Sequence, residues 1–115
     1  MNTVLLVGAG GVLGALARFA VGSLLTGRQR DTLVVNVLGS FALGALTAGL
    51  ADEEVLAVFG TGFCGAFTTF SSFAVETVEL YESGARREAV ANATVNLVGA
   101  LLAVGLGGWV ATTLI

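Results

Sequence analysis

Residues Val55 to Val78 read VLAVFGTGFCGAFTTFSSFAVETV, and this stretch decides the fold. Glu76 is its one charged residue, and the stretch is longer than the roughly 20 helical residues that cross a hydrocarbon core of about 30 Å. On either side of it, three more apolar stretches occupy approximately residues 3–25, 32–51 and 91–114. We therefore predict an all-α membrane protein with four transmembrane helices in a single domain, residues 1–115.

The composition of the chain supports a protein that is solvated by lipid. Of its 115 residues, 56% are hydrophobic and 11% are charged, which is far from the composition of an ordinary soluble domain. The sequence has no His and a single Cys, Cys64, so it offers neither an intrachain disulfide nor a Cys/His zinc site. No pair of nucleophile and base is visible either, and we expect no enzymatic activity. With a net charge of -3, nucleic acid is not an expected partner.

One motif near the N-terminus imitates a nucleotide-binding unit. In VLLVGAGGVLGALAR, residues 4–18, the glycines resemble the turn between a strand and a helix that binds a dinucleotide, and Asp31 lies downstream. However, Asp31 follows two Arg residues in a loop, and no alternation of strands with amphipathic helices follows. We reject the nucleotide interpretation. The stretch also lacks a basic flank and a cleavage site, so we expect a retained helix.

The arginines predict the orientation of the four helices. Four of the five basic residues fall in the first and third connections, and none falls in the second connection. By the positive-inside rule, the first and third connections should be cytoplasmic and both termini should lie outside. The basic residues in these connections are Arg28, Arg30, Arg86 and Arg87. This imbalance predicts one fixed orientation.

Small residues recur at intervals of four in three of the predicted helices. In a bilayer such spacing lets two helix backbones approach closely, so we expect these positions to lie at packing surfaces. They are Gly10 and Gly14 in the first helix, Ser40, Gly44 and Ala48 in the second, and Gly99, Ala103 and Gly107 in the fourth.

Three polar residues inside the predicted helices call for a functional hypothesis. Arg18 can either extend to the membrane surface or draw anions into a vestibule. Asn36 offers N–H donors without a charge, and its alternatives are an ordinary interhelical hydrogen bond or a contact with an anion. Glu76 lies close enough to the end of the third helix to reach water, which favours a structural or entrance role over proton coupling.

The third helix combines small and hydroxyl-bearing residues that favour a local break. Such side chains bond to nearby backbone groups, and a break between Gly65 and Thr68 would free carbonyl oxygens that suit a hard cation such as Na+. Four phenylalanines would form one stripe if the helix were intact. A phenyl ring edge is the positive part of its quadrupole, so Phe beside hydroxyl donors can form a path for an anion. These rings belong to Phe63, Phe67, Phe70 and Phe73.

Three blocks of the sequence resemble, in order and spacing, the signatures of the fluoride channel family called Fluc or CrcB. They are GGVLGALARF (residues 10–19), TLVVNVLGSFALG (residues 32–44) and GFCGAFTTFSSF (residues 62–73). The resemblance covers the first three helices, and the third block is its most specific part. It implies passive, selective export of fluoride across the plasma membrane, after HF has entered the cell and dissociated. A pore for this strongly hydrated anion replaces water with closely placed donors.

The resemblance also implies an assembly and a set of site residues. The assembly is a dimer of two subunits in opposite orientations, with two fluoride pores and a structural Na+ at its centre. Matched by position, Gly65 and Thr68 would offer backbone carbonyls to Na+, while Asn36, Phe70 and Phe73 would face fluoride. Further candidates for the polar lining or vestibule are Arg18, Ser71, Ser72 and Glu76.

The fourth helix departs from the pattern of the family. Asn92 and Asn96 stand where a Tyr and a hydroxyl residue are expected, which leaves open whether the pore lined by this helix conducts. One alternative is therefore a non-conducting partner subunit of a fluoride channel. Another is a small multidrug-type, proton-coupled exporter, but such proteins need an acidic residue in the first helix, which here has Arg18. The opposite-orientation partner is either a homologous subunit or a second copy of this chain.

Overall fold

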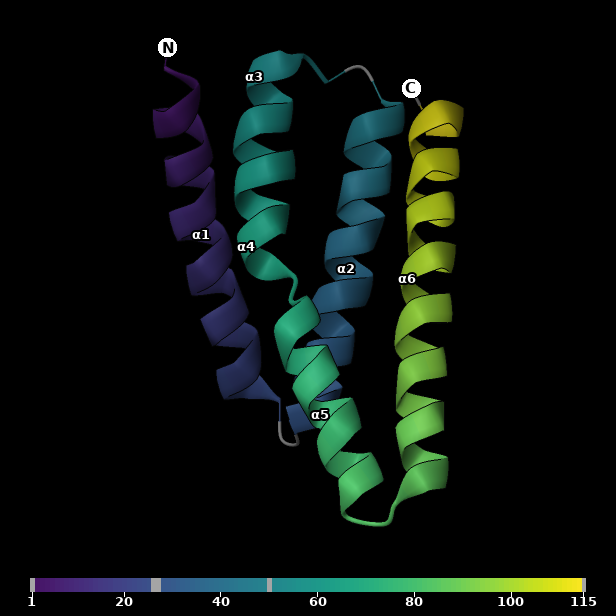
Figure 1. Cartoon of the computed structure of the whole chain (residues 1–115). Coiled ribbons are helices and arrows are strands. Elements are labelled where there is room, and N and C mark those ends of the chain that lie inside the picture. The colour runs from purple at the N-terminus through teal and green to yellow at the C-terminus, as the bar shows by residue number, and fades with distance from the viewer. Residues whose placement is uncertain (1, 26–27, 50, 115) are drawn as a thin grey trace.

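The computed structural model describes residues 2–25, 28–49 and 51–114, which form an all-helical bundle. Both termini lie at the same end of the bundle (Figure 1), as four consecutive antiparallel spans require. The third span is a series of joined segments, and the other three spans are single helices. The helices are α1 (Thr3–Leu24), α2 (Arg28–Ala48), α3 (Glu53–Val55), the π-helical η1 (Leu56–Cys64), α4 (Gly65–Phe67), α5 (Phe70–Glu82) and α6 (Arg86–Leu114).

The prediction of four membrane spans is confirmed. Residues 3–24, 30–48, 53–82 and 86–114 form helices that are long and apolar enough to cross a bilayer, and the part of the chain that the structure describes contains no strand. Large apolar side chains point outward along the bundle, as expected where lipid replaces water. Among the most exposed are Leu24, Phe19, Leu102 and Trp109.

The third and fourth spans are longer than the stretches 55–78 and 91–114 predicted from the sequence. α5 continues to Glu82 and α6 already begins at Arg86, because a helix can extend beyond the hydrocarbon core with charged residues that face water. The turn between them is tight. Gly84 has a positive φ of 94°, and the N–H of Ala85 donates to the carbonyl of Leu80. These two features are those of a Schellman motif, which ends α5.

Glycine lets α1 lie directly against the backbone of η1. A Cβ atom on Gly10 would collide with the carbonyl of Val58, and one on Gly14 would collide with the carbonyl of Phe63. From the other side, a Cβ on Gly62 would lie 2.6 Å from the carbonyl oxygen of Val7. Close approach of this kind provides the van der Waals contact that holds membrane helices together.

The second close contact joins α2 and α6, which run side by side (Figure 1). A Cβ on Gly44 would collide with the carbonyl of Val104, and one on Gly107 would collide with the carbonyl of Phe41. Gly10, Gly14, Gly44 and Gly107 were all predicted at packing surfaces, and all four are buried there. The bundle thus consists of two tightly packed pairs, with α5 lying against α6.

The third span changes direction at two residues with extended backbone. Thr68 has φ −86° and ψ 164°, and Thr69 has φ −150° and ψ 121°, whereas Gly65 is helical. α5 then begins afresh, with the Thr69 side chain as its N-cap. The extended residues also divide the phenylalanines into two pairs instead of the single stripe of an intact helix. Phe63 stacks on Phe67 above the bend, and Phe70 lies beside Phe73 below it.

Candidate functional site

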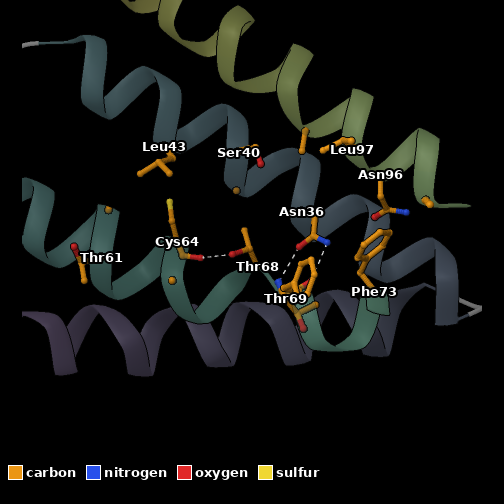
Figure 2. Close-up of a pocket in the computed structure, with 16 residues that line it drawn as sticks. Asn36, Ser40, Leu43, Thr61, Cys64, Thr68, Thr69, Phe73, Asn96 and Leu97 are labelled. Carbon is orange, nitrogen blue, oxygen red and sulfur yellow. Dashed lines mark hydrogen bonds between the residues drawn. The ribbon is translucent and has the colours of Figure 1, made fainter. Parts of the chain in front are cut away.

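Asn36 on α2 holds the extended part of the third span through two hydrogen bonds. Its Nδ2 donates to the carbonyl oxygen of Thr69 over 3.0 Å, and its Oδ1 accepts from the N–H of Thr69 over 2.8 Å. In Figure 2 both bonds cross directly from α2 to the bend. A side-chain amide carries one acceptor and two N–H groups, so Asn36 can satisfy this backbone and still offer one N–H to another acceptor.

The bend redirects two backbone amides away from the carbonyls that they would meet in an intact helix. The N–H of Thr69 donates to Asn36, and the N–H of Ser72 donates to Oγ1 of Thr69 over 3.1 Å. In an intact α-helix each N–H donates to the carbonyl four residues earlier, so these amides would have bonded to the carbonyls of Gly65 and Thr68. The carbonyls of the last turn before the bend thus lose their usual intrahelical donors.

An open groove of about 710 Å³ runs along this bend, between α2, the third span and α6. Figure 2 shows Asn36 facing Thr69 across the bend, and the ring of Phe73 beside Asn96. Most of its remaining wall is apolar or small. The lining residues that the sequence analysis predicted for the site are Asn36, Gly65, Thr68, Phe70, Phe73 and Asn96.

Two phenyl rings lie at the polar part of this groove. The ring centroids of Phe70 and Phe73 are 5.7 Å apart, and the rings are inclined by 56°. Phe70 is 78% exposed in the single subunit, whereas Phe73 is partly covered. Rings at this inclination present their edges in different directions, and a ring edge is the part of a phenyl group that attracts negative charge.

Arg18 and Ser72 form a separate polar contact on the other side of the third span. Nη2 of Arg18 donates to Oγ of Ser72 over 2.9 Å. Arg18 also lines a second open groove, of about 520 Å³, together with Asp31. Ser71 is exposed and its hydroxyl lies 3.3 Å from that of Thr69. Neither serine lines the groove that contains Asn36.

Glu76 does not reach water, contrary to the expectation from the sequence. Glu76 is 3% exposed, and its Oε2 accepts a hydrogen bond from Oγ1 of Thr32 over 2.8 Å. The expectation was wrong because α5 continues to Glu82, which places Glu76 well inside the helix, and because the first turns of α2 cover it. A buried carboxylate that is held by a hydroxyl donor is a structural feature of this end of the bundle.

The two asparagines of α6 belong to a directed series of hydrogen bonds. Oγ1 of Thr77 donates to the carbonyl of Phe73 over 2.8 Å, and Nδ2 of Asn92 donates to that Oγ1 over 2.9 Å. Nδ2 of Asn96 then donates to the backbone carbonyl oxygen of Asn92 and to its side-chain Oδ1. Asn96 is buried and lines the groove, whereas Asn92 does not line it.

Three hydroxyl residues that position these candidates were not identified from the sequence. Thr69 is one of the hydroxyl-bearing residues of the third helix, and Thr is among the preferred N-cap residues. Thr32 and Thr77 are the partners of Glu76 and Asn92. No local pattern identifies these two, because the contacts join helices that are distant in the sequence.

Comparisons with known proteins match almost the whole chain. The family model described as CrcB-like protein, Camphor Resistance (CrcB), matches residues 5–108 and thus extends into the fourth helix. A protein of Natronomonas pharaonis, named fluoride-specific ion channel FluC 2, is 56% identical over 106 residues, which cover 91% of this chain and 90% of the relative. FluC 1 of Halobacterium salinarum is 50% identical over 103 residues, covering 88% and 87%. FluC of Methanocaldococcus jannaschii is 40% identical over 115 residues, covering 93% and 92%.

Proposed function

This chain belongs to the CrcB family, and we propose that it is a subunit of a fluoride-selective ion channel that lets fluoride leave the cell down its gradient. The observation that carries the proposal is the match, over about nine tenths of the chain, to relatives that are named as fluoride-specific channels. The groove adds physical support. Asn36 can offer an uncharged N–H, and the rings of Phe70 and Phe73 can offer positive edges, at a place where a dehydrated anion needs both.

Fluoride efflux from liposomes that contain this chain, read with a fluoride electrode, tests the proposal. We expect rapid efflux that excludes chloride when this chain is present together with a homologue of opposite orientation. Proton-coupled exchange of a cationic drug would overturn the assignment in favour of a small exporter, although α1 contains no acidic residue for such exchange. Efflux that required a co-expressed homologue would favour an obligate pair of homologous subunits over a channel that this chain forms alone.

The carbonyls of Gly65 and Thr68 are our candidates for a structural Na+ at the centre of a dimer. Their usual helical donors are the amides of Thr69 and Ser72, which bond instead to side-chain oxygens. Carbonyl oxygens are hard ligands that suit Na+, so these residues fit the ion. When bound, Na+ would neutralise the carbonyl dipoles of two bends at the centre of the dimer.

We propose that the subunit pairs with a second one of opposite orientation, in the plasma membrane. The helix starts that carry Arg30, Arg86 and Arg87 lie at one end of the bundle (Figure 1), while Glu53 and Glu54 lie at the other. A subunit whose basic residues are concentrated at one end inserts in one direction. An antiparallel pair therefore requires a homologue whose basic residues lie at the other end. The numbers 1 and 2 in the names of the relatives agree with this. A C-terminal reporter that was active on both sides of the membrane would restore the homodimer.

The remaining candidates are assigned to the entrance and lining of the path. Arg18, with Ser72 as its partner, would attract anions at the second groove. Ser71 would face the path once a partner subunit covers the exposed ring of Phe70. Glu76 would stabilise the bundle near the entrance, and Asn92 would orient Asn96.

A further inference from the structure

The turn between α5 and α6 carries an arginine that lies against an aromatic ring. The guanidinium carbon of Arg86 is 4.8 Å from the centroid of the Tyr81 ring. Tyr81 is 52% exposed, and both Arg86 and the next residue, Arg87, are exposed. A guanidinium group is attracted to the face of an aromatic ring, so this contact holds Arg86 in place. Neither arginine forms an ion pair with another residue that the structure describes, and their N–H groups can therefore bind an acceptor outside the chain.

The charge on this face of the turn is positive. Successive residues of an α-helix are rotated by about 100°, so residues two positions apart lie on nearly opposite sides. Glu88 is two positions after Arg86 on α6, which directs its carboxylate away from the guanidinium. Glu79 is likewise two positions before Tyr81 on α5. Glu82 is the one remaining acidic residue of positions 79–88, and the second arginine offsets its charge. The guanidinium over the ring thus leaves this surface with a net positive charge.

An exposed apolar surface begins directly beside the arginine and the ring. Val78 lies three residues before Tyr81 on α5, and residues at this spacing are neighbours on a helix. Val90 likewise lies four residues after Arg86 on α6. Both valines are more than half exposed, and both lie further from the turn, toward the middle of their spans. The surface therefore joins a positive charge at the end of the bundle to apolar side chains on its bilayer side.

We propose that this surface, made of Val78, Tyr81, Arg86, Arg87 and Val90, binds an anionic phospholipid. The planar guanidinium of Arg86 can donate two N–H groups to the oxygens of the lipid phosphate. An acyl chain of the same lipid then covers the two valines. Arginines beside a membrane span attract anionic headgroups, and Tyr is enriched at the depth of those headgroups. A free phosphate or a nucleotide is a poorer partner, because it would leave the apolar part of the surface uncovered.

None of these five residues lines either groove, so the lipid site can be tested without fluoride transport. Native mass spectrometry of the purified channel counts the lipids that stay bound in detergent. We expect phosphatidylglycerol, which is anionic, to bind at a lower concentration than phosphatidylcholine with the same chains, whose choline cancels the phosphate charge. Equal binding of the two lipids would overturn the anionic site. Retention of inorganic phosphate in place of the lipid, from a sample that contains both, would overturn the choice of a lipid.

Arginine variants test where the lipid binds. Arg86→Gln should weaken the binding of phosphatidylglycerol by about fivefold, which is the contribution of one arginine near an anionic headgroup. Arg30→Gln is the matched control, because it removes an exposed arginine from the same end of the bundle (Figure 1) that does not lie over an aromatic ring. Its affinity should stay within about twofold of the wild type. An equal loss in both variants would show only a general attraction between charges and would overturn the site.

Two substitutions of Tyr81 test whether the ring positions Arg86. Tyr81→Phe keeps an aromatic face under the guanidinium and should bind the lipid much as the wild type does. Tyr81→Leu keeps an apolar side chain but removes that face, so it should weaken binding severalfold. Because Tyr81 is exposed, both variants should fold. If Tyr81→Leu bound the lipid as strongly as Tyr81→Phe, the ring would have no part in the site.

Discussion

The amide of Asn36 binds the backbone of Thr69 at both its N–H and its carbonyl, over 2.8 Å and 3.0 Å. A backbone residue outside a helix needs partners for both groups when it lies within the membrane. Asn36 supplies both from the neighbouring helix and thereby holds the two extended residues in place. This one side chain links the shape of the third span to the groove, so its substitution should affect structure and transport together.

Asn36→Asp should abolish fluoride efflux. Aspartate keeps the oxygen that accepts from Thr69, but it places a second oxygen against the Thr69 carbonyl and adds a negative charge to the path. We expect the efflux rate, read with a fluoride electrode, to fall at least tenfold. Asn2→Asp is the matched control, because the side chain of Asn2 caps α1 at the surface and Asp caps a helix equally well. Equal efflux from the two variants would contradict this role of Asn36.

Phe70→Ile and Phe73→Ile should each lower efflux strongly, by tenfold or more. Isoleucine fills much of the same space but has no quadrupole, so the groove loses the positive edges that face an anion. Phe59→Ile provides the comparison, because Phe59 is exposed on η1 and does not line the groove. If all three variants transported fluoride at the same rate, the rings would serve only for packing.

The four spans and the packing glycines could be predicted from the sequence because they depend on local composition. Hydrophobic length identifies a span, and small residues four apart identify a face for close contact, as at Gly10 and Gly14. Local composition does not show which polar side chain meets which. The sequence offered Asn36 as a donor without identifying Thr69 as its partner, and it placed Glu76 in water although Thr32 covers it. It named Asn96 as a candidate without identifying Asn92 as the residue to which its nitrogen donates.

Gly14→Ala should prevent the folded channel from accumulating. A methyl group at this position collides with the carbonyl of Phe63, and backbone on both sides leaves no room for adjustment. Gly8→Ala changes the same helix in the same way, but nothing lies within 4 Å of its added Cβ. In detergent, size-exclusion chromatography should show a folded peak for Gly8→Ala and no such peak for Gly14→Ala. A normal peak for Gly14→Ala would show that α1 and η1 can separate without loss of the fold.

Arg18→Gln should slow efflux most at low ionic strength. In the role proposed for Arg18, its charge at the second groove would raise the local concentration of anions, and salt would screen this effect over about 10 Å at 0.1 M. Glutamine can still donate to Ser72, so the contact between α1 and α5 is kept while the charge is removed. We expect a severalfold lower rate at 10 mM salt and a smaller difference at 1 M. A difference that does not change with salt would assign Arg18 to structure alone.

Thr32→Val should destabilise the folded subunit, because valine has nearly the same shape as threonine but cannot donate to the carboxylate of Glu76. Removing one partner of a buried hydrogen bond costs about 1–3 kcal/mol, and bonds to charged groups lie at the upper end of that range. We expect the free energy of unfolding in detergent to fall by about that amount. Thr47→Val is the control. Among the described residues the hydroxyl of Thr47 bonds to two carbonyls of its own helix, those of Leu43 and Gly44, so its loss should cost well under 1 kcal/mol. Equal stability of both variants would mean that Glu76 does not depend on this donor, and the buried carboxylate would then be held chiefly by its other surroundings.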